Sequence, residues 1–600
     1  MRTSGWTLTD WLDTYTRQEA TPAELLTPLV DALDASDPAW TYRINRAELN
    51  QQLAFLNDKS PADLPLYGIP FAVKDNIDVA GLPTSAACPA YSYDARNSAT
   101  AVARLTQAGA IVIGKTNLDQ FATGLVGTRS PYGAVPNSVN PDYISGGSSS
   151  GSAVVVARGL VPFSLGTDTA GSGRVPAGFN NIVGLKPTKG RFSTRGVVPA
   201  CRSLDCVSIF ALGVDDAATV ARHLEAFDSA DAYSRKPQLS VQTHLFGSAP
   251  NIAIPESIDW CGDDAQREAW LIAVQQLKEA GANITTLDFT PMQNLAQLLY
   301  GGAWVAERGA AVGDFIAQKP AEVNDVVGGI ISQSANFTAI DVFNAEYRRA
   351  ELAQEIQSLM REVDALMVPT TVRFPTQADV AADPVGVNTQ LGMFTNFVNL
   401  ADCAALSVPA PKRSDALPFG ITFIAPAWSD NALIALGAYW QQQQPWTKGA
   451  SEQTLPLTPA KPAGIDDQFI RVAVVGAHLT GMPLNHQLTS RSARFVCETN
   501  TADRYRLYAL SNTQPAKPGL ARDDTGSAIT VELWDMPLTL FGSFVAEIPA
   551  PLGIGNVTLA DGSTVKGFIC EPAGLKGALD ITEYGGWRNF LNNKNKVANQ

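Results

Sequence analysis

The sequence has 600 residues, of which 45% are hydrophobic and 17% are charged. This length exceeds the roughly 250–300 residues at which a single hydrophobic core stops growing, so we expect at least two domains. The formal net charge of −14 argues against a nucleic-acid partner and against an anionic membrane surface, because no surplus of basic residues is present.

The cysteines and the first residues indicate the class of protein. Seven cysteines are scattered along the chain without a Cys-x-x-Cys motif, so neither a disulfide scaffold nor a zinc site is predicted, and we expect no metal and no cofactor. Residues 1–26 include acidic side chains and no continuous apolar run, which is not typical of a signal peptide. The sequence contains no run of about 18 apolar residues, so no membrane span is predicted. We therefore expect a cytoplasmic protein.

In chain order, short β-branched runs first alternate with helical stretches. Strands are expected within residues 67–79 and 111–117, and helices at 98–110 and 153–159, the last of them fully buried. Helical periodicity then covers 264–282, 292–318 and 341–364, followed by strands at 365–369 and 418–426 and a helix at 430–444. Strands interleaved with helices predict an α/β fold with a mixed sheet covered by helices on both faces.

The texture changes after residue 444. The stretch "PWTKGASEQTLPLTPAKPAGIDDQF" is rich in proline and lacks periodicity, as linkers do. Beyond it, strands are expected within 471–479, 504–510, 528–536 and 557–570, the last with a turn at Asp561-Gly562. The predicted organisation is a first domain over 1–449, a linker over 450–468 and a small β-rich domain over 469–600.

The block 66–200 has candidates for nucleophilic catalysis but no histidine, although the chain has four. A serine nucleophile there would need another base, and Lys74 follows the apolar run "GIPFAV". Burial disfavours the ammonium form, and a neutral lysine is a competent general base. The alternative is a surface lysine beside Asp75.

Two clusters of glycine and serine flank the expected buried helix. They are "GGSSSGS" at 146–152 and "TAGSG" at 169–173. Consecutive small residues let backbone N–H groups converge on one point, where they can bind an anion. The N–H groups of Thr169, Ala170, Gly171 and Ser172 are therefore candidates for an oxyanion hole.

The segment "GGSSSGSAVVVARGLVPFSLGTDTAGSGRVPA", with "VKDN" upstream, resembles the amidase signature family. The resemblance covers residues 66–200 and extends more loosely to about 440. It implies the family's Ser-cisSer-Lys triad, with Lys74 as the base, Ser148 as a bridging serine after a cis peptide bond, and Ser172 as the nucleophile.

Four further positions of this segment bear on the resemblance. Ser150 and Ser152 stand where many members of the family have glycine, but neither is a triad position. Asp168 and Arg174 also match the family's pattern, and we interpret them as a buried ion pair that braces the loop.

A third segment, "LLYGGAWVAERG", resembles the substrate-binding segment of allophanate hydrolases. The resemblance implies that Tyr300 and Arg308 hold the carboxylate of the substrate, and a guanidinium suits a carboxylate by offering two parallel hydrogen bonds. An unbroken helix would separate the two residues by about 12 Å along its axis. Either both side chains lean inward or Gly301-Gly302 breaks the helix, and the alternative reading is a surface arginine.

The tail also resembles allophanate hydrolases, whose second domain is similar to the γ-glutamylcyclotransferase fold. In place of that fold's usual Tyr-Gly-Ser/Thr-Leu loop the chain has Gly476-Ala477-His478-Leu479. The resemblance implies that this domain decarboxylates N-carboxycarbamate, with His478 as the leading catalytic candidate and His486 and Glu547 behind it. A structural histidine is the alternative.

Together, these resemblances imply a cofactor-free enzyme that converts allophanate to ammonia and carbon dioxide. The first domain would deaminate the substrate to N-carboxycarbamate through an acyl-enzyme. The alternatives are a broad-specificity amidase, an inactive scaffold and an amidotransferase A-type subunit. We expect a small-molecule substrate, a homodimer formed through the first domain, and functional coupling to a urea carboxylase on a separate chain. The sequence leaves open whether urea or triazine breakdown supplies the allophanate.

Overall fold

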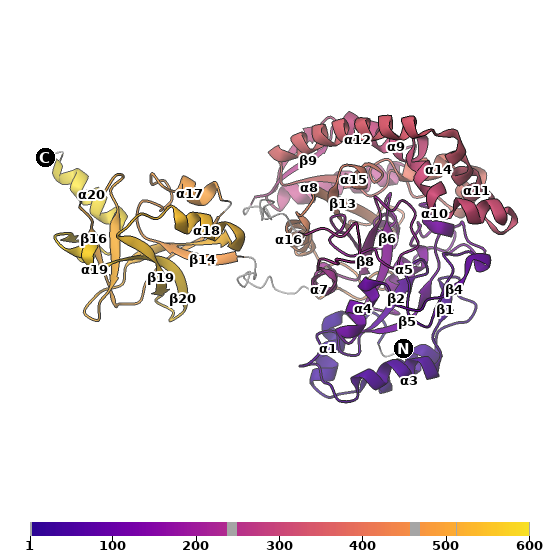
Figure 1. The fold of residues 1–600 in the computed structure, drawn as a ribbon, viewed down its shortest axis with the longest axis horizontal. Coiled ribbons are helices and arrows are strands. Elements are labelled where there is room, and N and C mark those ends of the chain that lie inside the picture. Colours follow the sequence, from indigo (N-terminus) through magenta and orange to yellow (C-terminus); the bar gives the residue numbers. More distant parts are fainter. Residues whose placement is uncertain (1–2, 237–248, 457–468, 492, 512, 599–600) are drawn as a thin grey trace. The chain divides into compact units, whose positions relative to one another are not determined.

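The computed structural model describes residues 3–236, 249–456, 469–491, 493–511 and 513–598. The described residues form two compact units, one over 3–236 and 249–456 and one over 469–598 (Figure 1). Residues 450–456, expected in the linker, pack on the first unit: the Ala450 N–H donates to the Ala157 carbonyl (2.9 Å), and Leu455 is buried. The rest of the expected linker, 457–468, lies outside the described residues.

An 11-stranded mixed sheet organises the described part of the first unit. It combines parallel pairs, such as β2 with β5 and β6, with antiparallel pairs, such as β6 with β8. In spatial order the strands are β1 (Trp40–Arg43), β5 (Ile111–Thr116), β2 (Pro70–Lys74), β6 (Phe163–Asp168), β8 (Cys206–Ala211), β7 (Val183–Lys186), β12 (Cys403–Ala410), β13 (Phe419–Pro426), β11 (Ala365–Pro369), β9 (Asn251–Pro255) and β10 (Asn283–Leu287). The central strands are buried along their whole length, which explains why apolar and small residues dominate their sequences.

Helices pack on this sheet in two groups. Helix α5 (Ser150–Ala157) contacts α6 (Val175–Phe179), whereas α7 (Val214–Leu224) contacts α16 (Asp430–Gln441). Every side chain of α5 is buried, as the run of small and β-branched residues predicted. The expected α/β fold with a large mixed sheet is confirmed.

The periodic stretch 292–318 forms two helices, α9 (Thr290–Gly301) and α10 (Trp304–Gln318). Gly302 lies between them in extended backbone (φ −123°, ψ −169°). A Cβ atom at Gly302 would lie 2.5 Å from the Leu298 carbonyl oxygen, so the turn requires glycine. Of the two geometries that the sequence allowed for Tyr300 and Arg308, the protein adopts the broken helix.

The remaining helices of the first unit lie around these elements (Figure 1). They are α1 (Leu8–Thr16), α2 (Pro22–Asp31), α3 (Arg46–Leu53), α4 (Thr100–Gln107), α8 (Asp264–Glu279), α11 (Asp325–Ser332), α12 (Ala339–Leu359), α13 (Gln377–Ala382), α14 (Gly386–Leu391) and α15 (Phe397–Leu400), with a small hairpin of β3 (Pro83–Thr84) and β4 (Tyr93–Asp94). Capping boxes at Thr7, Thr21 and Thr338 fix the starts of α1, α2 and α12. Within the described ranges no single helix is long and apolar enough to cross a membrane; one pair, 325–336 with 339–362, passes by length and composition only when taken together, and it is bent by 101°.

The second unit is β-rich, as predicted. A five-stranded sheet has the order β15 (Arg494–Asn500), β18 (Thr530–Pro537), β14 (Phe469–Val474), β20 (Thr564–Cys570), β19 (Leu552–Thr558), and a three-stranded sheet has the order β17 (Pro518–Arg522), β16 (Tyr505–Ala509), β21 (Leu579–Asp580). The helices are α17 (His486–Thr489), α18 (Leu538–Ala546), α19 (Pro572–Leu575) and α20 (Trp587–Ala598). Gly562 (φ +84°) lies in the predicted turn between β19 and β20. The unit has a hydrophobic core of its own, which includes Val472, Trp534 and Phe568.

Candidate active site

Lys74 ends β2 inside the protein, with no exposed surface. Its Nζ donates to the hydroxyl oxygens of Ser148 (2.8 Å) and Thr167 (2.7 Å). Burial lowers the pKa of Lys74 to about 7, although Asp119, Asp168 and Asp205 act in the opposite direction. The surface-lysine alternative is therefore wrong.

Asp75, the sequence neighbour of Lys74, is not its partner. The Asp75 carboxylate forms a buried ion pair with Lys115 (3.0 Å) and accepts a hydrogen bond from the Ser85 hydroxyl. Lys74 therefore has only neutral hydroxyl partners within hydrogen-bonding distance, which favours its uncharged form.

A chain of hydrogen bonds continues from Lys74 to Ser172. The Ser148 Oγ donates to the Ser172 Oγ (2.9 Å), and the Gly147–Ser148 peptide bond is cis. A Cβ atom at Gly147 would lie 2.1 Å from the Asp119 Oδ2, and Gly146 has φ +74°, so this turn accepts only glycine at both positions. Lys74, Ser148 and Ser172 thus form one continuous route for a proton.

The two serines that depart from the family's usual glycines lie outside this chain. The Ser150 hydroxyl donates to the Asn117 carbonyl (3.3 Å), and the Ser152 hydroxyl donates to the Leu165 carbonyl (3.0 Å). Both hydroxyls are buried and hydrogen-bonded to backbone carbonyl groups, so they support the start of α5 without contacting Ser172.

The loop after β6 is braced by the ion pair of Asp168 and Arg174. Both side chains are fully buried, and the two nitrogens of the guanidinium lie 2.8 and 2.9 Å from the carboxylate oxygens. The same carboxylate accepts hydrogen bonds from the N–H groups of Gly171 and Gly173, both at 3.0 Å. This ion pair holds the loop, as we interpreted it from the sequence.

This bracing changes the set of oxyanion donors. The Gly171 N–H is already bonded to Asp168, so it is not free to donate to a substrate oxygen. The N–H groups of Thr169, Ala170 and Ser172 have no acceptor among the described residues. Of the four expected N–H groups, the loop therefore leaves those of Thr169, Ala170 and Ser172 as candidate donors and removes that of Gly171.

Arg308 on α10 is buried, with 1% of its surface exposed. One Nη donates to the Thr123 hydroxyl (3.0 Å), the other lies 3.5 Å from the Tyr300 hydroxyl, and the guanidinium lies 5.1 Å from the Tyr300 ring centroid. Within the described part of the chain no carboxylate lies within 4.0 Å of its nitrogens, and its Nε has no partner. The surface-arginine alternative is wrong.

The neighbours of Arg308 do not neutralise it. Glu307 binds the backbone N–H (2.7 Å) and hydroxyl (2.8 Å) of Ser203 instead. Burial lowers the pKa of Arg308, but nearby Cys201, Tyr300, Asp205 and Glu307, none of them in an ion pair with it, raise this pKa by more, so the guanidinium keeps its charge. A buried cation without an anionic contact is a site prepared for an anionic ligand.

In the second unit a cavity of about 150 Å³ contains His478, Gln487, Lys517, Glu547 and Phe568 in its wall. The His478 Nε2 lies 2.8 Å from the Gln487 Oε1, and its ring stacks on Phe568 at 4.8 Å. Burial lowers the pKa of His478. Glu547 is paired with Arg491 (2.5 Å).

His486 is exposed and does not line this cavity. Its Nδ1 lies 2.9 Å from the Pro483 carbonyl oxygen. The second unit thus brings His478 and Glu547 to one cavity and leaves His486 outside it.

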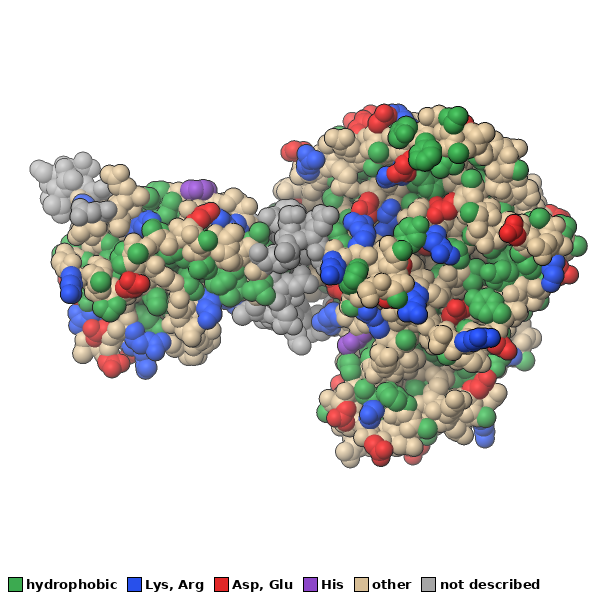
Figure 2. Space-filling view, in the orientation of Figure 1, with side chains coloured by type: hydrophobic (Ala, Val, Ile, Leu, Met, Phe, Trp, Pro, Cys, Tyr) green, Lys and Arg blue, Asp and Glu red, His purple; other side chains and the backbone are tan. Residues whose placement is uncertain are grey.

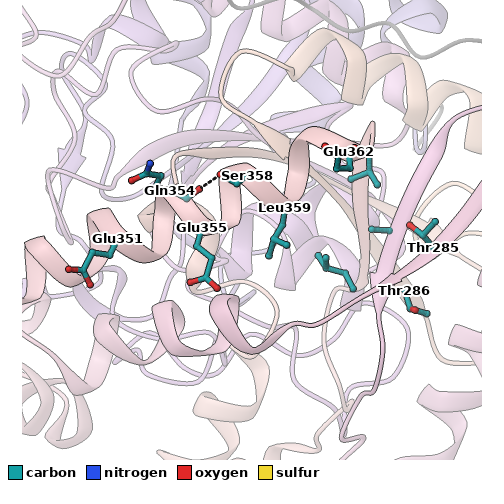
Figure 3. A pocket seen from close by; sticks show the side chains of 11 residues that line it. Thr285, Thr286, Glu351, Gln354, Glu355, Ser358, Leu359 and Glu362 are labelled. Carbon is teal, nitrogen blue, oxygen red and sulfur yellow. Dashed lines mark hydrogen bonds between the residues drawn. The ribbon is translucent and has the colours of Figure 1, made fainter.

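A larger groove of about 700 Å³ lies elsewhere on the first unit, between the second half of α12 and β10 (Figure 3). Glu351, Glu355 and Glu362 face it from one side and Thr285 and Thr286 from the other. It contains no residue of the hydrogen-bonded chain. Among the described residues no cluster of histidine, cysteine, aspartate and glutamate is suited to hold a metal ion.

Sequence reasoning did not find Thr167, Thr123 or Asp205, which bind Lys74, Arg308 and Thr169 respectively. Thr167 lies inside the segment that resembles the amidase signature but is not one of the triad positions. No motif marks Thr123 or Asp205. Their partners lie 36 to 185 residues away in the sequence, so only the folded chain identifies them.

Both units of the chain resemble known proteins. A family model described as Amidase matches residues 24–434, and one described as Allophanate hydrolase C-terminal domain matches residues 470–592. The structure of Kluyveromyces lactis allophanate hydrolase is 46% identical, with a TM-score of 0.84 over 98% of this chain and 100% of that one.

Two curated relatives extend the comparison. Urea amidolyase of Saccharomyces cerevisiae is 46% identical over 99% of this chain, but the chain spans only about one third (34%) of that protein. The A-type subunit of the Glutamyl-tRNA(Gln) amidotransferase from Akkermansia muciniphila is 32% identical over 72% of this chain and 98% of its own length. The chain therefore belongs to the amidase family and carries, after its amidase domain, the C-terminal domain of allophanate hydrolases.

Proposed function

We propose that this protein hydrolyses allophanate to ammonia and carbon dioxide, and that its first unit catalyses the deamination to N-carboxycarbamate. The observation that carries the proposal is the buried Arg308 guanidinium, which lacks an anionic contact and contacts Tyr300. Allophanate is a urea with a carboxylate on one nitrogen, so its carboxylate supplies the missing charge while its terminal amide is presented to Ser172. The likeness to allophanate hydrolase supports the same substrate.

In the proposed mechanism the hydroxyl hydrogens of Ser172 and Ser148 turn toward Lys74, and neutral Lys74 takes a proton from Ser148 as Ser148 takes one from Ser172. The Ser172 oxygen attacks the terminal amide carbonyl, and the N–H groups of Thr169, Ala170 and Ser172 stabilise the oxyanion. The proton returns along the same chain to the leaving nitrogen, so ammonia departs and an acyl-enzyme remains. Water then attacks the acyl-enzyme, which releases N-carboxycarbamate and a proton.

The second unit is proposed to promote the decarboxylation of this product, and we keep His478 as its catalytic residue. His478 delivers one proton to the bridging nitrogen as the C–N bond breaks, which yields carbamate and carbon dioxide. The carbamate then takes up a proton and separates into ammonia and carbon dioxide. The sum is two ammonia and two carbon dioxide per allophanate.

The test of the substrate compares allophanate with an uncharged amide such as benzamide. Arg308→Met should lower kcat/KM for allophanate by about 100-fold, the loss expected for paired charge-assisted hydrogen bonds, and should spare hydrolysis of the uncharged amide. Ser172→Ala should abolish ammonia release from both. A broad-specificity amidase would instead show no preference for allophanate, and Arg308→Met would leave it unchanged.

We also propose a homodimer formed through the first unit. Helix α12 exposes Ile340, Val342, Phe343 and Tyr347, and hydrophobic side chains are visible along the rim where Figure 1 places this helix (Figure 2). An exposed apolar stripe on a 21-residue helix suits association with a second copy. Phe343→Asp should convert a dimer to a monomer in sedimentation velocity. An amidotransferase component would instead need a different partner chain, so a stable complex with foreign subunits would contradict the proposal.

The cellular context is proposed on the same basis. The likeness to urea amidolyase supports functional coupling to a urea carboxylase, which would supply allophanate from urea. We also propose a cytoplasmic location, as expected from the sequence. Ammonia release from urea by a mixture of this protein and a urea carboxylase, and by neither alone, is the expected result.

A further inference from the structure

A buried carboxylate outside the proposed catalytic chain, Asp205, binds the loop that carries the oxyanion donors. Asp205 immediately precedes β8, and Thr169 immediately follows β6. The two strands are antiparallel neighbours with Asp168 opposite Cys206, so Asp205 and Thr169 meet where the strands end. The Thr169 hydroxyl donates to the Asp205 Oδ1 at 2.5 Å.

The Asp205 carboxylate is itself held by the turn before it. Its Oδ2 accepts from the Ala200 N–H (2.9 Å), and its Oδ1 accepts from the Cys201 N–H (3.1 Å). The turn, which includes Ser203, is also attached to helix α10, because the N–H and the hydroxyl of Ser203 both donate to Glu307 of that helix. Asp205 therefore joins a fixed turn to the first residue of the oxyanion loop.

We propose that Asp205 is a positioning residue that fixes the oxyanion loop, residues 169–173, through the Thr169 hydroxyl. The free N–H groups of Thr169 and Ala170 belong to the backbone on either side of the Thr169 side chain. The hydrogen bond that holds the Thr169 hydroxyl therefore also fixes the direction in which these two N–H groups point. Donors that stabilise an oxyanion must be fixed before the charge develops. This inference rests on the proposed function, since it assigns a role in that reaction.

The charge of Asp205 acts on the base as well. Burial raises the pKa of Asp205 to about 6, against the hydrogen bonds from Thr169, Cys201 and Ala200 and the charge of Arg308. The ionisable groups that feel it are Arg308, Lys74 and the thiols of Cys201 and Cys206. Because Asp205 raises the pKa of Lys74, neutralising Asp205 lowers the pH at which Lys74 loses its proton.

The test measures initial ammonia release from allophanate by the full chain between pH 5 and 9. Asp205→Asn should lower kcat by about 10-fold or more, as for partial loss of oxyanion stabilisation, while KM changes less than about twofold. It should also move the acidic limb of the kcat/KM profile to lower pH. Thr169→Val keeps the side-chain shape without the donor and should lower kcat similarly. The double variant should be no slower than the slower single variant, because both changes break one contact.

The matched control is Asp228→Asn. Asp228 also accepts hydrogen bonds from side-chain hydroxyls, those of Thr100 (2.7 Å) and Ser193 (2.8 Å), but does not contact the oxyanion loop. It should leave kcat and the pH profile unchanged. The inference is overturned if Asp205→Asn keeps the parent kcat, if its loss adds to that of Thr169→Val, or if the acidic limb does not move. Full ammonia release by Ser172→Ala would instead overturn the proposed function and this inference together, so the two failures are distinguishable.

Discussion

Lys74 has no acidic partner within hydrogen-bonding distance, and that environment sets the pH dependence of the proposed reaction. The pKa of Lys74 is about 7 in the folded protein, lowered chiefly by burial. The neutral amine is the active form and is populated above this pKa, so kcat/KM should rise through about pH 7 and level off above it. A rate profile from pH 5 to 9 tests this. A profile that falls through pH 7 would contradict the role of Lys74 as base.

Lys74→Arg extends the same prediction. Arginine keeps its charge throughout this pH range, so it cannot accept the proton from Ser148. Ammonia release should fall by about 10²–10⁴-fold, the usual contribution of a general base. The control is Lys115→Arg, in which the buried partner of Asp75 keeps its charge and the hydrogen-bonded chain is untouched.

At the residue scale the sequence predicts the site residues that belong to a motif, and it misses the contacts that form only when distant segments fold together. The assignment of Lys74, Ser148 and Ser172 follows from the resemblance of the two glycine-serine clusters and the upstream lysine to the amidase signature family, and the structure places the three residues in one hydrogen-bonded chain. The Gly171 donor was expected free but is bonded to Asp168, because the ion pair with Arg174 turns that carboxylate toward the loop. Periodicity carries no information about such contacts.

At the element scale the interrupted helix α9–α10 determines how Tyr300 and Arg308 meet. A Cβ atom at Gly302 would lie 2.5 Å from the Leu298 carbonyl oxygen, whereas one at Gly301 would meet nothing within 4 Å. Gly302→Ala should therefore displace α10 relative to α9 and raise KM for allophanate by about 10-fold, since a small misplacement of a substrate-holding group is costly. Gly301→Ala is the matched control and should leave KM unchanged. Equal effects of the two substitutions would contradict this account.

Helices and strands were predicted where a single periodicity of apolar residues continued along the segment, and they were missed where that periodicity was interrupted. The single expected helix over 292–318 is two helices because apolar periodicity does not register a backbone break at glycine. Strands β15 and β17 were missed because charged or proline residues interrupt the apolar residues of "RFVCETN" and "PGLAR". Strand β18 was found because "TVELWDMP" combines β-branched and aromatic residues.

At the scale of the whole molecule, composition separated two units but placed the boundary too early. Residues 450–456 look like linker because they lack periodicity, yet the Ala450 N–H donates to the Ala157 carbonyl (2.9 Å) and Leu455 is buried. Such a segment is held by contacts with distant residues, which local composition does not encode. The second unit was predicted as β-rich, and its separate core explains why the texture of the sequence changes there.

The division into two units allows the two chemical steps to be separated by one substitution. His478→Ala removes the imidazole from the cavity of the second unit, so the proposed decarboxylation should slow by about 10²-fold or more, as for loss of a general acid. The first ammonia should appear at the parent rate, because the chain from Lys74 to Ser172 lies in the other unit. Stopped-flow detection of carbon dioxide beside an enzymatic assay of ammonia distinguishes the two events.

The control for this prediction is His486→Ala, which removes an exposed histidine of the same unit that does not line the cavity. It should change neither rate. Burial lowers the pKa of His478, so the imidazole is mainly neutral at neutral pH in the absence of substrate. The negative charges of bound N-carboxycarbamate would favour the protonated imidazole, which can donate a proton to the bridging nitrogen. Carbon dioxide release should therefore slow with rising pH, whereas the first ammonia release should not. Parallel loss of both products in His478→Ala would show that the second unit supports the first and has no separate step.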